Sequence, residues 1–276
     1  MNAFETHNLC KQYSGFTLND LNLKLPSGTI LGLIGENGAG KSTTIKLLLG
    51  MTQPDSGTFS LLGQAQPDME DIGVVLDEPG FPLCLNPKQI GKVMAGIYRR
   101  WDSTAYTNYL TRFSLPENKK YSGLSRGMKM KLAIAVALSH HPKLLILDEA
   151  TNGLDPMVRE EILDLFNDFT REEDHSILIS SHIVSDLEKI CDYIAFLHKG
   201  QLMLYEEKDA LYQRYGRIIC SREDFETLAP GAIKGKKESP YGVEVIVYRE
   251  LVPAHWKLVP VNIEDLFVFM AKEDAQ

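Results

Sequence analysis

Apolar residues along this chain fall into two kinds of segment. The first kind is a short apolar run with the length of a strand buried on both faces. These runs lie within residues 29–34, 72–76, 143–150 and 176–182. The second kind has helical composition, at residues 91–101, 105–113, 129–138 and 157–170. Strands that alternate with helices predict an α/β fold with a central, largely parallel sheet.

Two further patterns extend this sheet. Residues 4–25 tend to alternate between apolar and polar positions, which predicts half-buried antiparallel strands ahead of the first buried run. Residues 193–205 predict a hairpin whose turn lies at residues 198–200. The helical segments near residues 85–142 therefore form an insert between two strands of the sheet.

The pattern changes beyond about residue 206. A strand is predicted at residues 242–248 and a short capped helix at residues 262–270, with a basic, solvated turn at residues 234–237 ahead of them. We therefore predict a core domain at residues 1–205, which contains the helical insert, and a small α+β accessory region at residues 206–276.

A glycine-rich sequence, GENGAGKST, follows the first buried run. The spacing of Gly35, four residues, Gly40, Lys41 and Ser42 is that of a phosphate-binding loop. Glycines permit positive φ and a close approach of amides to an anion, and the helix that begins near Lys41 adds its positive end. Lys41 is expected to reach the β- and γ-phosphates, and the Ser42 hydroxyl to coordinate Mg²⁺. The alternative is a glycine-rich turn that contains a lysine. The predicted nucleotide contacts are Gly35, Asn37, Gly38, Ala39, Gly40, Lys41, Ser42 and Thr43.

Two carboxylates follow the buried run at residues 144–147. Open α/β sheets bind ligands at the carboxyl ends of their strands, which is where Asp148 and Glu149 lie. Asp148 is suited to holding Mg²⁺ through its water shell, and Glu149 to orienting a water molecule toward the γ-phosphate. The alternative is that the two acids only cap the following turn. Together with the phosphate loop, they predict an α/β P-loop NTPase.

Three more motifs carry a resemblance to a known family. They are LSRGMKMKLAIAVAL at residues 124–138, TNGLDP at 151–156 and ISSH at 179–182. With the phosphate loop and the acidic strand, these motifs resemble those of the ATP-binding subunits of ABC transporters, over about residues 1–205. In that family, two subunits enclose two ATP molecules, and the signature motif of each completes the site of the other.

The resemblance assigns roles to single residues. Tyr13 is similar to the aromatic that stacks on adenine, Ser125 and Gly127 belong to the signature, and residues 152–155 form the D-loop. His182 takes the place of the switch histidine, so the predicted catalytic residues are Lys41, Glu149 and His182. Ser125 is also a plausible helix N-cap. The alternatives are that Tyr13 is a rim aromatic and His182 a surface histidine.

The chain departs from the family pattern at two motifs. Arg126 and Met128 stand where the usual signature has Gly and Gln, and Asp77 stands where the family has a metal-touching glutamine. A carboxylate suits Mg²⁺, so the predicted metal ligands are Ser42, Asp77 and Asp148. The alternative is that Asp77 caps the turn before Pro79 and faces solvent. The form DEPGF, with the later RRWD, resembles bacterial ATPases that work with separate permeases for antimicrobial peptides or drugs.

Composition and charge restrict the kinds of partner that the chain is expected to have. The chain has 276 residues and a net charge of −8 without a long basic block, so we expect no nucleic-acid partner. Its apolar runs are far shorter than the roughly 18 residues that a membrane span needs, and its first residues do not resemble a signal peptide. Four widely spaced cysteines predict reduced thiols in the core.

These observations predict a cytoplasmic ATPase that binds ATP and Mg²⁺ and lies on the inner face of the cell membrane through an integral membrane permease. A second ATP-binding subunit is also expected. A copy of the same chain suffices, because one sequence carries all the motifs, and a different subunit stays open. The first alternative is a soluble ATP-driven clamp of the same superfamily. The second is a P-loop kinase, which would not need the signature motif.

Overall fold

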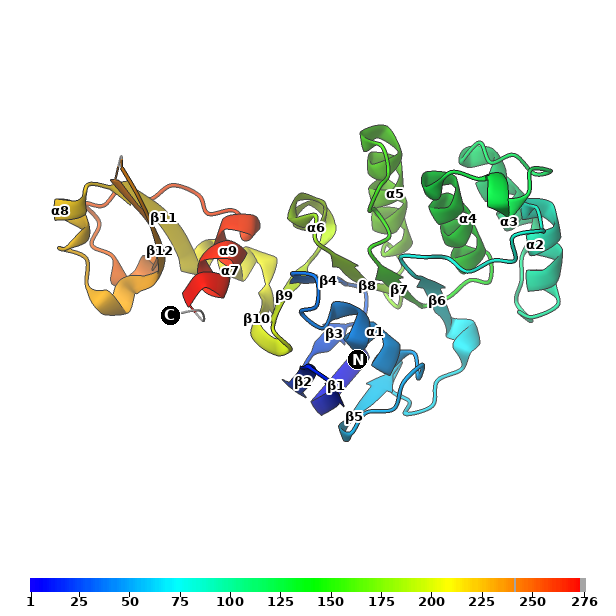
Figure 1. Cartoon of the computed structure of the whole chain (residues 1–276), viewed down its shortest axis with the longest axis horizontal. Coiled ribbons are helices and arrows are strands. Elements are labelled where there is room, and N and C mark those ends of the chain that lie inside the picture. Colours follow the sequence, from blue (N-terminus) through cyan, green and yellow to red (C-terminus); the bar gives the residue numbers. More distant parts are fainter. Residues whose placement is uncertain (241, 274–276) are drawn as a thin grey trace.

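The computed structural model describes residues 1–240 and 242–273, and it has an elongated shape (Figure 1). A central sheet occupies the middle of the molecule. Helices α2 to α4 lie at one end of the long axis, and the C-terminal strands and helices lie at the other. This arrangement confirms the predicted α/β fold with a helical insert.

The central sheet has the strand order β10-β9-β4-β8-β7-β6, and every pairing except β10 with β9 is parallel. All four predicted buried strands belong to this sheet. The hairpin is also confirmed, because β9 and β10 are joined by the turn at Lys199 and Gly200. The strands are β4 (Ile30–Gly35), β6 (Ile72–Val75), β7 (Leu144–Asp148), β8 (Ser176–Ser181), β9 (Tyr193–His198) and β10 (Gln201–Glu207).

The continuous apolar character of these strands follows from burial on both faces of the sheet. Along β4, Ile30 and Ile34 join the apolar cluster that contains the helices of the insert, whereas Leu31 and Leu33 join the cluster beneath the N-terminal strands. Successive side chains of a strand point to opposite faces, so two apolar layers require an unbroken apolar sequence.

The N-terminal strands form a separate antiparallel sheet, as the alternating pattern predicted. It packs on the central sheet through the second of these apolar clusters, to which Phe4, Leu9 and Leu18 contribute. The strands are β1 (Asn2–Tyr13), β2 (Phe16–Leu21), β3 (Lys24–Pro26) and β5 (Ser56–Leu61).

Six helices belong to the core and its insert. They are α1 (Lys41–Leu48), α2 (Pro87–Ala95), α3 (Ser103–Arg112), α4 (Arg126–Leu138), α5 (Pro156–Phe169) and α6 (Val184–Ile190). The prediction of a helix at residues 91–101 was wrong in its bounds. Pro87 is the first residue of α2, and the side chains of Asn86 and Gln89 form a capping box with the backbone.

The C-terminal region consists of a three-stranded sheet, β11-β13-β12, with helices around it. We predicted a turn at residues 234–237, and this was wrong. These residues are part of β12, where buried Gly235 packs against Phe269. The predicted boundary at residues 205 and 206 falls within β10. The elements are α7 (Lys208–Arg214), β11 (Tyr215–Cys220), α8 (Arg222–Phe225), β12 (Ile233–Ser239), β13 (Gly242–Tyr248) and α9 (Ile263–Glu273).

Helix α9 joins the C-terminal region to the core. It packs against α6 as well as β12, and the rings of Phe196 and Phe267 meet edge to face with centroids 5.3 Å apart. Several apolar residues of this region therefore belong to the same buried cluster as those of the core. Within residues 1–240 and 242–273, no helix has both the length and the apolar character that crossing a membrane requires.

The four cysteines are free thiols, but they are not all in the core. Cys191 is buried, and its burial raises the pKa of the thiol. Cys10 and Cys220 are partly buried. Cys84 is exposed on the segment between β6 and α2, so the prediction of core thiols was wrong for this residue.

Candidate nucleotide-binding site

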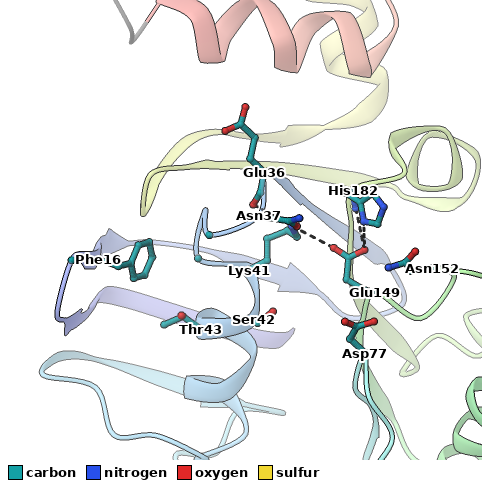
Figure 2. A pocket seen from close by; sticks show the side chains of 13 residues that line it. Phe16, Glu36, Asn37, Lys41, Ser42, Thr43, Asp77, Glu149, Asn152 and His182 are labelled. Carbon is teal, nitrogen blue, oxygen red and sulfur yellow. Dashed lines mark hydrogen bonds and ion pairs between the residues drawn. The ribbon is translucent and has the colours of Figure 1, made fainter. Parts of the chain in front are cut away.

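The central sheet brings the phosphate loop, Glu149 and His182 together at the carboxyl ends of its parallel strands. Strands β4, β6, β7 and β8 run parallel, so the segments that follow them emerge side by side. A cavity of about 540 Å³ lies there (Figure 2). Its lining residues are Gly15, Phe16, Glu36, Asn37, Gly38, Gly40, Lys41, Ser42, Thr43, Asp77, Glu149, Asn152 and His182.

The phosphate loop connects β4 to α1 as its glycine pattern predicted. Gly40 is the N-cap of α1 and has φ of 114°, a conformation that residues with a Cβ rarely adopt. Gly35 serves a different purpose, because a Cβ there would lie 2.6 Å from the carbonyl oxygen of Leu197. The loop is thus held close to β9 and turns sharply into the helix.

Lys41 extends from the first turn of α1 into the cavity, where it is 5% exposed. Its ammonium donates a hydrogen bond to the carbonyl of Gly35 at 2.7 Å and lies 3.4 Å from Oε1 of Glu149. A buried ammonium needs such partners. The carboxylate of Glu149 therefore serves as its anionic partner in this arrangement.

Glu149 follows β7 with a positive φ of 53°, which is uncommon for a residue with a side chain. Its amide donates to the carbonyl and the hydroxyl oxygen of Ser180, at 3.1 and 3.2 Å. His182 Nδ1 lies 2.6 Å from Oε2 of the same carboxylate. Figure 2 shows Lys41, Glu149 and His182 pointing toward one another. The side chain of His182 is half exposed, but because it contacts Glu149 it is not an isolated surface histidine.

Asp148 directly precedes Glu149 in the chain but does not line the cavity. It is buried, and Ser180 Oγ donates a hydrogen bond to its Oδ1 at 2.5 Å. Ser42 and Asp77 do line the cavity. In the described part of the chain, no group of three or more His, Cys, Asp or Glu residues could hold a metal alone. The side-chain oxygens of Ser42, Asp77 and Asp148 suit Mg²⁺, because this ion commonly binds to one or two protein oxygens together with phosphates.

Asp77, which departs from the family pattern after β6, contacts Arg126, which departs from it in the signature motif. Its Oδ1 accepts a hydrogen bond from Nη2 of Arg126 at 2.6 Å. The alternative prediction was that Asp77 caps the turn before Pro79 and faces solvent; its side chain is 45% exposed, but it lines the cavity and pairs with a guanidinium.

The aromatic of the cavity is Phe16, and sequence analysis missed it. Tyr13 is not part of the lining; it is 42% exposed, with the ammonium of Lys11 above its ring. The two aromatics are directly paired partners at the end of the β1–β2 hairpin. The signal was present in the sequence, since Ser14 and Gly15 form a two-residue connection that places residue 16 opposite residue 13. Gly15 and Glu36 are the other missed residues.

The signature residues lie outside the cavity. Ser125 is the N-cap of α4, as predicted, and accepts a hydrogen bond from the amide of Met128 at 3.3 Å. Gly127 lies against Leu154 of the segment that follows β7. Gly35, Ala39 and Asp148 are close to the cavity in the chain but do not line it.

A glycine loop at the start of α1, a buried lysine above it and an acidic pair at the end of β7, a parallel strand of the same sheet, define a P-loop nucleotide-binding protein. The sequence model described as ABC transporter matches residues 18–152.

The chain is 31% identical over 271 residues to ABC transporter ATP-binding protein YtrB of Bacillus subtilis (strain 168), covering 91% of both. Bacitracin transport ATP-binding protein BcrA of Bacillus licheniformis is 38% identical over 226 residues, covering 78% of this chain and 73% of that protein. A solved ATP-binding subunit of an ABC transporter superposes with a TM-score of 0.68 and 27% identity, covering 76% of this chain and 91% of that one.

The chain therefore belongs to the ABC transporter family. It is an ATP-binding subunit that hydrolyses ATP, which confirms the resemblance found in its motifs.

Proposed function

We propose that this ATPase drives the export of peptide-like antimicrobial compounds through a separate integral membrane permease. The observation that carries the catalytic part is the position of Glu149 between Lys41 and His182. The substrate class is supported by the similarity to the bacitracin transport ATP-binding protein. Membership in a family of transporter subunits supports a location on the cytoplasmic face of the membrane, where the permease would hold the chain.

The roles of the site residues follow from their positions. The amides of the phosphate loop and the ammonium of Lys41 would bind the β- and γ-phosphates. Ser42, Asp77 and Asp148 would hold Mg²⁺, which neutralises phosphate charge when bound. Glu149 would orient the attacking water and take up its proton, while His182 keeps the carboxylate in place through the 2.6 Å contact.

Two chains are expected to form the active unit. Ser125 and Gly127 lie at the start of α4 and outside the cavity of their own chain, so they are free to complete a site on another subunit. A homodimer is our proposal, because one sequence carries every motif. A heterodimer with a different ATP-binding subunit is the alternative that size measurements in the presence of Mg-ATP would reveal.

Phe16 is expected to contribute more to ATP affinity than Tyr13. Replacing Phe16 with alanine removes the aromatic wall of the cavity and should raise the dissociation constant for ATP about three- to tenfold, the range of an aromatic stacking contact. Tyr13→Ala should change it less than twofold. Titration of both variants with a fluorescent ATP analogue tests this. A larger loss in Tyr13→Ala would restore the prediction from the sequence.

The permease is expected to dock beside the segment that follows β6. A hollow of about 370 Å³ lies there, lined by residues that include Phe81, Leu83, Tyr121 and Lys129. Leu83 is 62% exposed at its rim, and the exposed thiol of Cys84 lies next to it. An exposed leucine at a hollow lined by both apolar and charged side chains suits a short helix of a membrane partner.

Leu83→Glu is therefore expected to reduce co-purification with the permease at least tenfold, because it places a charge at the contact. Ile219→Glu is the matched control; Ile219 is also exposed, but lies in the C-terminal region. Association should also protect Cys84 from a maleimide. If Leu83→Glu and Ile219→Glu associate equally well with the permease, the docking site lies elsewhere.

The export proposal has its own test. Cells that produce the chain with its permease should tolerate a peptide antibiotic such as bacitracin better than cells that produce the Glu149→Gln variant with the same permease. Equal sensitivity would count against this substrate class. Failure to co-purify with any polytopic membrane protein would instead favour a soluble ATP-driven clamp.

A further inference from the structure

The two departures from the family pattern are in contact with each other. Asp77 follows β6 and Arg126 begins α4, 49 residues later, and their side chains form an ion pair at 2.6 Å. Asp77 stands in place of a glutamine and Arg126 in place of a glycine. An amide and a hydrogen atom could not form this contact, so the pair is a property of this chain and not of the usual motifs.

Arg126 also touches the D-loop. A Cβ built on Gly153 would lie 3.3 Å from Cδ and 3.4 Å from Nε of Arg126. The arginine side chain therefore lies directly over Gly153, while its guanidinium reaches Asp77. One side chain thus links the wall of the nucleotide cavity to the segment that follows Glu149.

Asp77 stands at the boundary between two hollows. It lines the nucleotide cavity with Lys41, Ser42 and Glu149, and it lines the neighbouring hollow with Arg126. The side chains of Asp77 and Arg126 remain 45% and 55% exposed. Ion pairs with this much exposure contribute little to stability, because water and salt screen them. A stronger ligand for the carboxylate can therefore displace the guanidinium.

We propose that Arg126 competes with Mg²⁺ for the carboxylate of Asp77, so that binding of Mg-ATP opens the Asp77–Arg126 ion pair. This inference rests on the proposed function in one respect, the binding of ATP with Mg²⁺ in this cavity. Arg126 is thus a positioning residue, which sets the Mg²⁺ concentration at which the nucleotide binds through its hold on Asp77. A divalent cation attracts a carboxylate more strongly than one guanidinium does, which makes the exchange possible.

A double-mutant cycle on Asp77 and Arg126 tests the competition. The measurement is the Mg²⁺ concentration that gives half-maximal binding of a fluorescent, non-hydrolysable ATP analogue. Arg126→Ala should lower this midpoint about three- to fivefold, because it frees Asp77 for the metal. Asp77→Asn should raise it by a similar factor. In the Asp77→Asn background, Arg126→Ala should have an effect of less than 1.5-fold, roughly, since no carboxylate is left to compete for.

Arg100→Ala is the matched control. Arg100 pairs with Asp71 at 2.7 Å, and this pair is also partly exposed, but neither residue lines the nucleotide cavity. Its removal should leave the midpoint unchanged. An equal reduction by Arg126→Ala with and without Asp77 would show a general effect of charge and overturn the proposal. Failure of the parent chain to bind the analogue at any Mg²⁺ concentration would instead refute the proposed function. The side chains of Asp77 and Arg126 are about half exposed, so thermal unfolding of the variants at these two positions should match that of the parent.

Discussion

Replacement of Lys41 by alanine is expected to abolish ATP binding at concentrations that saturate the parent chain. The ammonium is buried above the phosphate loop, with its hydrogen bond to Gly35 and its contact with Glu149. When ATP binds, its phosphates would replace these groups as the partners of the ammonium. Each charge-assisted hydrogen bond contributes about 1.5–3 kcal/mol, so loss of two of them weakens affinity on the order of a hundredfold or more.

Lys46→Ala provides the matched control for this variant. Lys46 is on the same helix but exposed, and it does not line the cavity. Calorimetric titration with Mg-ATP should give an affinity for Lys46→Ala within about twofold of the parent, as expected for a surface substitution. A Lys41→Ala variant that binds ATP within threefold of the parent would remove the lysine from the proposed site.

The sequence was sufficient for the parts of the fold that have a strong local signal. Strands β4, β7 and β8 are buried on both faces, so their apolar runs are unbroken and easy to detect. Burial also explains why the order of the sheet could not be predicted. The partners of β4 are β8 and β9, far along the chain, and continuously apolar strands carry no pattern that distinguishes one neighbour from another.

Errors arose where one residue has two possible roles. The helix was predicted to begin at residue 91, although proline is favoured in the first turn of a helix, which is the position of Pro87 in α2. The lysines of residues 234–237 suggested a solvated turn. In β12, Gly235 is buried whereas Lys236 and Lys237 are exposed, and a strand at the edge of a sheet readily carries exposed lysines.

The site was predictable where spacing alone carries the chemistry, as in the phosphate loop. The contacts among motifs were not. Glu149 lies between Lys41 and His182 only because β4, β7 and β8 are adjacent, and the sequence does not contain that adjacency. The pairing of Asp77 with Arg126 likewise depends on how α4 packs beside β6. Each departure was visible in the sequence, but the contact between the two side chains was not.

The second large effect is expected for Glu149→Gln, which should retain ATP but lose hydrolysis. An amide keeps the size of the side chain but does not accept a proton from water, and general-base catalysis contributes about 10²- to 10⁴-fold to a rate. Binding of ATP before hydrolysis should become more favourable. The carboxylate now lies 3.4 Å from the ammonium of Lys41, and without its charge this lysine is free for the γ-phosphate. We expect the free energy of ATP binding to become more favourable by on the order of 1 kcal/mol.

Glu173→Gln is the control, because Glu173 is an exposed glutamate that does not line the cavity. Its rate of phosphate release should stay within about twofold of the parent rate. Hydrolysis in Glu149→Gln comparable with the parent would mean that another group activates the water.

The same variant decides the oligomeric state. When ATP is bound but not hydrolysed, the closed pair of subunits should persist, so light scattering should show a dimer of Glu149→Gln with Mg-ATP and a monomer without it. Dimerisation should disappear in the Lys41→Ala, Glu149→Gln double variant, because the nucleotide that joins the subunits no longer binds. A Glu149→Gln chain that binds ATP yet remains a monomer would show that Ser125 and Gly127 serve a different partner subunit, since their own chain then offers them no site.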